Sequence, residues 1–400
     1  MSKGCISMLE YDVTEPLNTD YYSVFADIPE TDRAAWCRAR TFVEDSLPEM
    51  NDCWERAEFP AHLVKVMGEM NLLSDGVSVE GHQQLSALAA GLVNMEVSRG
   101  DGSLGTIIAV QGGLALRSIA FFGSEEQHHA WLGPMVRGEK LGAFALTEPE
   151  HGSDSVALET TARLDGSEYV LNGEKKWIGN GCGGDITVVW ARDEAGNVRG
   201  FLVEQDRPGY EAAPITGKAS LRAMNQALIR LNNVRVPITN VLPGTRTFKD
   251  VTKVLVATRL GVAWSALGHA TAVYEAALNY VAHRTQFGKP LAKFQLIQDR
   301  LAYMLSELTS MQLHCVHLAA LDTAGRMTPT QAAMAKYHNT RKARELASIA
   351  RDMLGGNGIL LENHVIRHLL DIESIHTYEG TQSIQALLIG RDVTGQSAFA

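Results

Sequence analysis

Long stretches of helical periodicity toward the C-terminal end constrain the fold of this chain most strongly. Apolar residues recur there at spacings of three and four, the pattern of a helix that buries one face. Each stretch is longer than an average globular helix, and the breaks at 288–290 and 325–329 are short. Long helices with short connections pack side by side. We therefore expect a helical bundle, built on the periodic stretches 254–282, 294–324 and 330–353.

The middle of the chain has a different pattern. Short runs rich in β-branched and aromatic residues replace the helical periodicity, at 169–171, 186–190, 200–203 and 229–236. We expect turn-forming pairs to separate these strands, namely Asp165-Gly166, Asn172-Gly173 and Asn232-Asn233. This part is therefore predicted to be a β-barrel-like domain.

The N-terminal part is again helical in pattern. Periodic apolar stretches at 59–70 and 85–97 lie between glycine breaks, and strand signals are scarce. The chain is thus expected to be mainly α-helical with a central β domain. We divide it into an N-terminal helical domain (1–140), the β domain (141–243) and a C-terminal bundle (244–400).

Composition limits the functions open to this chain. Its net charge of −10 and pI near 5.7 argue against binding nucleic acid or an anionic membrane through general charge. Apolar residues make up 45%, and we find no run near the roughly eighteen apolar residues that span a bilayer. We expect a soluble protein that binds neither nucleic acid nor membrane.

The cysteines and the termini bear on the compartment. Five cysteines, at positions 5, 37, 53, 182 and 315, form no C-x-x-C pair, which is typical of reduced thiols in a cytosol-like compartment. Residues 1–12 lack the charged start and apolar core of a secretory signal, and the last four residues are not a peroxisomal address. We therefore expect a cytoplasmic protein without structural disulfides.

A carboxylate near the C-terminus is the candidate catalytic group. Glu379 lies in Thr377-Tyr378-Glu379-Gly380-Thr381. Removing a proton next to a carbonyl needs a base whose pKa is raised toward working pH, and burial among apolar groups raises the pKa of a carboxylate. The alternative is structural, since a glutamate in a helix's first turn complements the dipole while Thr381 makes local hydrogen bonds. Taken alone, the pentapeptide favours the structural interpretation.

Other familiar motifs are not supported. The glycine-rich run 179–184 leads into the strand-like run 186–190 rather than into a helix, which excludes a Rossmann fingerprint, and no P-loop occurs. Ser153 beside His151 lacks the G-x-S-x-G elbow of a hydrolase. No metal is expected, because we interpret the histidine pairs with metal-like spacing as packing or surface residues, at His314/His317 and His364/His368.

Three further segments suit a large, flat, anionic ligand, and each has a structural alternative. Residues 146–154 offer hydroxyls and backbone amides, or form a capped turn. Trp177 is able to stack on a flat cofactor, or is a half-buried strand residue. Arg284 and Phe287 suit a pyrophosphate and an adenine, or cap a surface helix.

Together these segments resemble the acyl-CoA dehydrogenase family. LTEPEHGSD, KKWIGN, RTQFG, MLGGNGI and TYEGT occur in that family's order and at its spacing, over nearly the whole chain. Each motif alone is weakly specific, but the ordered set is highly specific. The resemblance implies an N-terminal helical domain, a central β domain and a C-terminal four-helix bundle, with FAD between the β domain and the bundle.

The resemblance also implies roles for individual residues. Glu379 would remove the pro-R α-proton of an acyl-CoA while the β-hydrogen leaves as hydride to flavin N5, giving a trans-2-enoyl-CoA. The implied FAD contacts are Thr147, Ser153, Trp177, Gly179 and Thr381, with Arg284, Phe287, Gly355 and Gly356 reaching the FAD of a neighbouring subunit in a homotetramer built as a dimer of dimers. The expected substrate contacts are Leu104, Gly105, Ile108, Ser153, Tyr378 and Gly380.

One departure from the family bears on the substrate. The tail from 351 to 395 is most similar to glutaryl-CoA dehydrogenases and plant short-chain acyl-CoA oxidases. Where the glutaryl-CoA enzymes carry an arginine for the distal carboxylate, this chain has Gly105. A buried carboxylate without a cation is costly, so a short or branched monocarboxylic acyl chain is favoured over glutaryl.

A second departure bears on the electron acceptor. Gly179 stands where many dehydrogenases place a hydroxyl against flavin N5, and its loss would open space through which O2 reaches reduced flavin. We expect a short-chain acyl-CoA dehydrogenase that passes electrons to an electron-transfer flavoprotein. The alternatives are an acyl-CoA oxidase using O2, a glutaryl-CoA-type dehydrogenase, and a flavin-fold binding subunit without catalysis.

Overall fold

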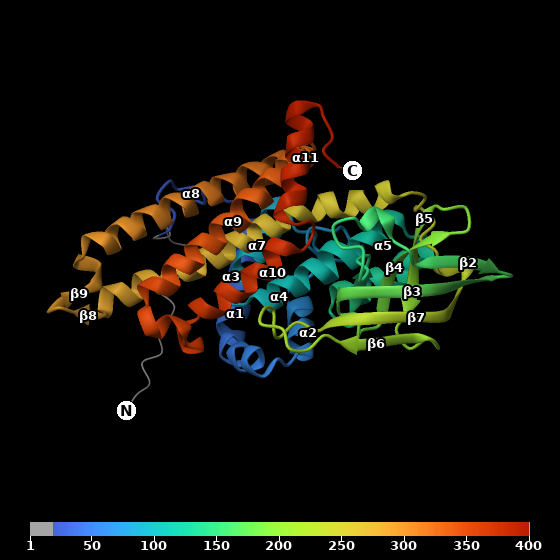
Figure 1. Ribbon diagram of the computed structural model, residues 1–400, viewed down its shortest axis with the longest axis horizontal. Helices are drawn as coiled ribbons and strands as arrows, with labels where there is room; N and C mark the ends of the chain where they lie inside the picture. The colour runs from blue at the N-terminus through green and yellow to red at the C-terminus, as the bar shows by residue number, and fades with distance from the viewer. Residues whose placement is uncertain (1–18, 400) are drawn as a thin grey trace.

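The computed structural model describes residues 19–399. Helices, then a curled β-sheet, then a second set of helices follow one another along the chain (Figure 1). This arrangement confirms the predicted fold, mainly α-helical with a central β domain. Cys5 and residues 1–12, on which the expectations about thiols and a secretory signal partly depended, lie outside the described residues.

The N-terminal helices surround a buried central helix, α3 (Ala87–Gly100). The Ser86 hydroxyl caps this helix by accepting from the Ala89 amide at 2.9 Å. Every residue of α3 from Ala89 onward is buried, because the helix packs between α1 and the C-terminal helix α7. The other helices here are α1 (Glu30–Arg56), α2 (Ala61–Glu69), α4 (Gly102–Ile108), η1 (Ala109–Leu116), α5 (Arg117–Phe122) and α6 (Glu125–Val136).

One apolar helical segment contradicts an expectation from the sequence. The elements α4, η1 and α5 follow one another without a break over Gly102–Phe122, and by length and composition this segment could cross a membrane. The statement that no such run exists was therefore wrong. In the fold, 67% of the apolar window is buried, as in the core helix of a globular domain.

Seven strands form one curled sheet in the order β1-β4-β2-β3-β7-β6, with β5 also paired to β4. The predicted runs fall within β3, β4, β5 and β7. Three strands were missed because they are short and consist largely of small or polar residues, which carry little strand signal. The strands are β1 (Gly142–Ala145), β2 (Thr161–Asp165), β3 (Glu168–Gly179), β4 (Ile186–Asp193), β5 (Val198–Glu204), β6 (Tyr210–Pro214) and β7 (Gln226–Pro237), with single turns η2 (Ser155–Ala157) and η3 (Ile238–Asn240).

Two of the three predicted turns are wrong. Asp165-Gly166 does connect β2 to β3, but Asn172-Gly173 lies inside β3 and Asn232-Asn233 inside β7. The register between these paired strands shifts at this point. The Asn233 amide donates to Asn172 Oδ1 at 2.8 Å, and Asn233 has a φ of +50°. The asparagines therefore form a β-bulge in continuous strands rather than chain reversals.

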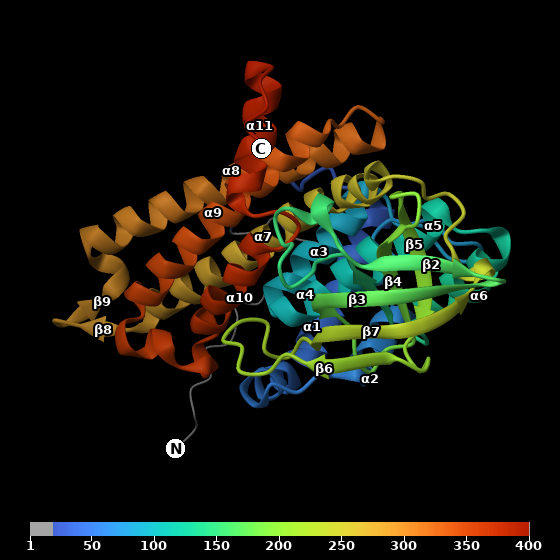
Figure 2. The ribbon, with the colours of Figure 1, turned by 45° about the vertical axis from the view of Figure 1, so that its right-hand side comes forward.

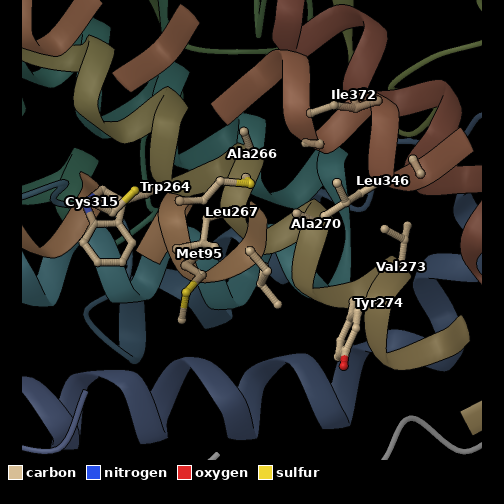
Figure 3. Packing of buried hydrophobic residues seen from close by; sticks show 14 of the residues in the cluster. Met95, Trp264, Ala266, Leu267, Ala270, Val273, Tyr274, Cys315, Leu346 and Ile372 are labelled. Atoms are coloured by element: carbon tan, nitrogen blue, oxygen red, sulfur yellow. The ribbon is translucent and has the colours of Figure 1, made fainter. Parts of the chain in front are cut away.

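The three predicted long helices are confirmed as α7 (Phe248–His283), α8 (Gln295–Thr323) and α9 (Pro329–Met353). Helix α7 lies at the centre, in contact with α3, α8, α9 and α10. Figure 3 shows the resulting core, in which Trp264 and Leu267 of α7 lie near Met95 of α3 and Cys315 of α8. Because partners surround α7, most of its residues are buried, and the helix positions side chains on several faces of the interior.

The remaining C-terminal elements are short. Helix α11 projects from the bundle in both views (Figures 1 and 2), and Gln385 is its one buried residue. The elements between are β8 (Thr285–Gln286), β9 (Lys289–Pro290), η4 (Leu291–Lys293), η5 (Gly355–Ile359), η6 (Leu361–Asn363) and α10 (Val365–Thr377), followed by α11 (Gln382–Thr394).

Candidate active site

Glu379 lies on the tight loop between α10 and α11. Helix α10 ends at Thr377, and the chain then turns through left-handed conformations at Glu379 (φ +52°) and Gly380 (φ +90°). The Thr381 hydroxyl caps α11 by accepting from the Ile384 amide at 3.4 Å. Thr381 thus makes the local bond of the structural interpretation, but Glu379 precedes the helix instead of lying in its first turn. A left-handed non-glycine residue costs energy and is common at functional sites.

The Glu379 carboxylate points toward α7. Thr258 Oγ1 donates a hydrogen bond to Glu379 Oε2 at 2.7 Å. Burial raises the pKa of Glu379, while the Thr258 bond and the cations Lys336 and Arg259 act in the opposite direction. The result is a half-buried carboxylate with a raised pKa, as a proton-abstracting base requires.

Tyr378, the residue before the base, anchors the loop in the interior. Its side chain packs against the apolar clusters of both helical parts. Burial and the Glu379 charge raise the pKa of its phenol, opposed by hydrogen bonds with Thr106 of α4 and Ser265 of α7. The loop that carries Glu379 is therefore held between α4 of the N-terminal helices and α7 of the C-terminal helices.

The predicted acyl-contact residues of α4 lie in this same buried region. Leu104 and Ile108 are each 1% exposed and belong to the apolar cluster on which Tyr378 packs. A Cβ added at Gly105 would approach Ser98 Oγ to 2.2 Å, and Ser98 in turn donates to Ser265 Oγ at 2.9 Å. No side chain fits at position 105 unless Ser98 moves. Ser98 therefore occupies the space into which an arginine at position 105 would extend.

Residues 146–154 and the KKWIGN segment at the end of β3 lie side by side. The Lys176 amide donates to the Thr147 carbonyl at 2.9 Å, which joins residues 146–154 to β3. Behind this contact, buried Lys175 Nζ donates to Glu148 Oε1 at 2.8 Å. Although burial alone would raise it, the pKa of Glu148 is held at about 2 by Lys175 and by hydrogen bonds from residues 159 and 160. The paired side chains support the loop that carries Thr147.

Trp177 is pushed out of the sheet by irregular backbone. Its φ is +65°, and the register between β3 and β7 shifts between Lys175 and Ile178. The indole is 52% exposed, with Lys176 Nζ at 5.7 Å from the ring. A bulge that directs an aromatic ring outward creates a flat apolar surface on which a planar cofactor can stack.

Gly179 does not leave the opening that was expected. A Cβ at this position would lie 2.8 Å from both Met224 Cε and Val110 Cγ2. These two side chains therefore fill the space that a side chain at 179 would need. The hypothesis that Gly179 opens a path for O2 was wrong in its physical basis, because neighbouring side chains close the gap.

The remaining predicted cofactor residues are on the surface and apart from the base. Ser153 is exposed in the loop after β1. Arg284 and Phe287 lie at the far end of α7 beside β8, remote from the sheet (Figure 1), and Phe287 is 93% exposed. Gly355 and Gly356 are exposed in the turn after α9, with open space where a Cβ would be. Within one chain the β8 end, which carries Arg284 and Phe287, does not join the sheet that carries Trp177 in a single site.

Several residues around the base were missed from the sequence. Thr258, Lys336 and Gln385 come from α7, α9 and α11, and none lies in a recognisable motif. Lys336 is 1% exposed, and burial lowers its pKa to about 7 against the attraction of Glu379. In the sequence, the signal that could have indicated Lys336 and Gln385 is that each is a polar residue at a helix position expected to face the core. Within residues 19–399 no group of three or more metal-binding side chains occurs.

Comparison with known proteins identifies the family. Models of the acyl-CoA dehydrogenase N-terminal, middle and C-terminal domains match residues 29–139, 143–234 and 248–394. The chain therefore belongs to the acyl-CoA dehydrogenase family, as the sequence motifs predicted.

Individual relatives are similar over nearly their full length. The short-chain specific mitochondrial acyl-CoA dehydrogenase of Homo sapiens is 37% identical over 381 residues, covering 93% of this chain and 92% of that protein. A crystal structure of glutaryl-CoA dehydrogenase from Mycobacterium smegmatis has a TM-score of 0.93 and 38% identity, covering 96% of this chain and 99% of that one. A structure of a glutaryl-CoA dehydrogenase from the same organism, in complex with FADH2, has a TM-score of 0.93 and 37% identity, covering 95% and 98%.

Proposed function

We propose that this protein is an FAD-dependent dehydrogenase that converts a short-chain acyl-CoA to the trans-2-enoyl-CoA, with Glu379 as the base. The observation that carries the proposal is the half-buried Glu379 carboxylate with its raised pKa on a rigid loop. Glu379 takes the α-proton onto a carboxylate oxygen, and the β-hydrogen leaves with its electron pair as the C=C bond forms. FAD, when bound, accepts that hydride.

The residues of this chain fit FAD. Trp177 offers an exposed ring at a bulge, and the loop that carries Thr147 lies directly beside it. We assign flavin contacts to Thr147, Ser153, Trp177, Gly179 and Thr381. The FADH2 complex of the related glutaryl-CoA dehydrogenase supports this cofactor.

We further propose a monocarboxylic acyl group. The space at Gly105 is occupied by Ser98, which is neutral, so no cation at that position balances a distal carboxylate. The human relative, which is short-chain specific, supports this choice. The similarity to glutaryl-CoA dehydrogenase keeps glutaryl-CoA as the second candidate substrate.

The test is flavin bleaching under anaerobic conditions. Wild-type protein with bound FAD is mixed with a panel of acyl-CoA esters from butyryl to octanoyl, together with isobutyryl and glutaryl esters. We expect bleaching by short monocarboxylic esters and at least tenfold slower bleaching by glutaryl-CoA. The reverse preference would assign the protein to the glutaryl-type reaction.

Replacing the base completes the test. E379Q should keep FAD and lose bleaching by at least 10³-fold, because the amide cannot accept the α-proton. E373Q is the matched control, since Glu373 is an exposed carboxylate of α10 bound to Arg344. Normal bleaching in E379Q would show that another group is the base, and absence of flavin in wild-type protein would favour a non-catalytic role.

For the electron acceptor we propose an electron-transfer flavoprotein over O2, because Val110 and Met224 close the space beside Gly179. Reoxidation of bleached enzyme by air within seconds would instead support the oxidase alternative. We also propose a homotetramer, built as a dimer of dimers, in which Arg284, Phe287, Gly355 and Gly356 reach a neighbouring FAD. Their exposure in the single chain, and the position of β8 at the end of the molecule away from the sheet (Figure 1), support this arrangement.

A further inference from the structure

The loop that carries Glu379 is held by two buried side chains from different helices. Lys336 Nζ of α9 donates to the carbonyl of Tyr378, and to that of Gly380 at 2.5 Å. Gln385 Nε2 of α11 donates to the carbonyls of Glu379 and Gly380 at 3.1 and 3.0 Å. All three carbonyls of residues 378–380 thus accept from side chains that are at most 1% exposed.

This arrangement explains how the strained backbone persists. The loop belongs to no helix or strand, so its carbonyls need other donors in the interior. The left-handed φ of Glu379 is disfavoured for a residue with a side chain and persists where the surroundings over-determine it. Lys336 bridges the carbonyls on either side of Glu379, so a rotation of that residue would break at least one of its bonds.

Lys336 also contributes charge at the base. The charged groups that act on Glu379 are Lys336 from α9, Arg259 from α7 and Asp75 from the loop after α2. Both cations favour the ionised carboxylate, and Asp75 opposes it. Among these groups of the described chain, Lys336 both binds the backbone carbonyls on either side of Glu379 and lowers the pKa of the Glu379 carboxyl.

We propose that Lys336 is a positioning residue for the base, holding residues 378–380 in the conformation that directs Glu379 toward Thr258 and stabilising the ionised carboxylate. The inference rests on the proposed function, in which Glu379 removes the α-proton. A lysine that merely fills the core would affect folding but would not change the titration of Glu379 or the mobility of this loop in particular.

Three substitutions separate the contributions of Lys336. K336M removes the donors and the charge, K336Q retains an amide donor without charge, and K336R retains both donors and charge. K342M is the matched control, because Lys342 lies on the same helix but bonds to Tyr303 and Glu345. The measurements are FAD content, KM and kcat, anaerobic bleaching rate against pH, and deuterium exchange of the amides of residues 378–381.

We expect K336M to retain FAD, to bleach at least 30-fold more slowly with KM changed less than threefold, and to exchange the loop amides faster. Its acid limb should move to higher pH, because loss of a cation raises the pKa of the base. K336R should restore the acid limb, K336Q should not, and K342M should match wild type.

A K336M bleaching rate within threefold of wild type, with an unchanged acid limb and unchanged loop exchange, would overturn the proposal. If K336M does not fold, K336Q and K336R decide, since equal acid limbs and equal loop exchange in these two would also overturn it. Failure of wild-type protein to bleach with any acyl-CoA would refute the proposed function instead, and is distinguishable because it appears before any substitution is made.

Discussion

At the scale of single residues, the chemistry of this protein depends on small groups near one carboxylate. Burial makes the ionised form of Glu379 costly, and a hydroxyl and two cations partly compensate. The pKa of Glu379 is therefore raised by burial and lowered in part by these three groups. Each compensating group should therefore be visible in the pH dependence of proton removal.

Thr258 gives the most direct prediction of this kind. T258V removes the 2.7 Å hydrogen bond to Glu379 Oε2 without changing side-chain volume much. The bond favours the charged form, so its loss raises the pKa of Glu379. Activity requires the ionised base and rises as pH passes through that pKa, so the acid limb should move upward.

The measurement is the anaerobic bleaching rate from pH 5 to 9. T258V should lose roughly tenfold at the acid end, because a hydrogen bond to a charged group is worth roughly 1.5 kcal/mol or more, and much less at the alkaline end. T252V is the control, because Thr252 is exposed on the same helix and its hydroxyl donates to the backbone carbonyl of Phe248, away from Glu379. An identical profile in T258V and wild type would show that this bond does not tune the base.

At the scale of elements, β3 carries a buried structural side chain and an exposed one close together. Lys175 points into the interior and bonds to Glu148, whereas Trp177, two residues later, points outward. In a regular strand both side chains would lie on the same face. The shift in pairing with β7 between Lys175 and Ile178 separates their directions.

This separation predicts that the indole can be removed at little cost to folding. W177A should lower FAD affinity roughly tenfold, since stacking on an aromatic ring, worth up to about 1.4 kcal/mol, is lost. The melting temperature of the apoprotein should change by no more than about 2 °C, because the ring is 52% exposed and a surface substitution typically changes stability by ~0.5 kcal/mol or less. Fluorescence titration with FAD and calorimetry of the apoprotein measure the two effects.

W177F serves as the conservative control and should retain most of the affinity. A fall in apoprotein stability as large as that of a core substitution would show that Trp177 is structural. Unchanged FAD affinity in W177A would remove the indole from the cofactor site.

At the scale of the whole molecule, exposed side chains at the β8–β9 end and the projecting helix α11 are the surfaces on which the proposed tetramer depends. Phe287 is 93% exposed, with its ring 6.2 Å from that of Phe294, and follows Arg284 by three positions in the chain. Helix α11 likewise projects from the bundle with one buried residue. We expect these surfaces to be covered by further copies of the chain in the proposed tetramer.

F287D should shift the assembly toward smaller species and lower FAD retention together, because a charge replaces an apolar contact and a cofactor contact is lost. Light scattering coupled to gel filtration measures the mass, and flavin absorbance measures the cofactor. L164D, at an exposed leucine of β2, is the control for a new surface charge. A wild-type protein that is monomeric with full FAD would refute the shared-site arrangement.

The sequence by itself determined the order of the three parts and the long helices, and it indicated Glu379 as the candidate base. Periodicity over 25 or more residues is a strong signal, which is why α7, α8 and α9 were predicted nearly to their ends. Ordered motifs likewise indicated the family. Short strands and asparagine-containing pairs carry weaker signals, so β1, β2 and β6 were missed, and two pairs that together form one bulge were taken for turns.

Only the tertiary structure decided what surrounds the base. Thr258, Lys336 and Gln385 are up to 127 positions apart in the sequence and lie on separate helices, so no local pattern links them to Glu379. The packing around Gly105 and Gly179 also could not be predicted from the sequence. A glycine in a sequence does not show whether the volume beside it is empty or is filled by neighbouring side chains. Burial and pKa depend on contacts between distant segments, and these exist only once the helices have packed.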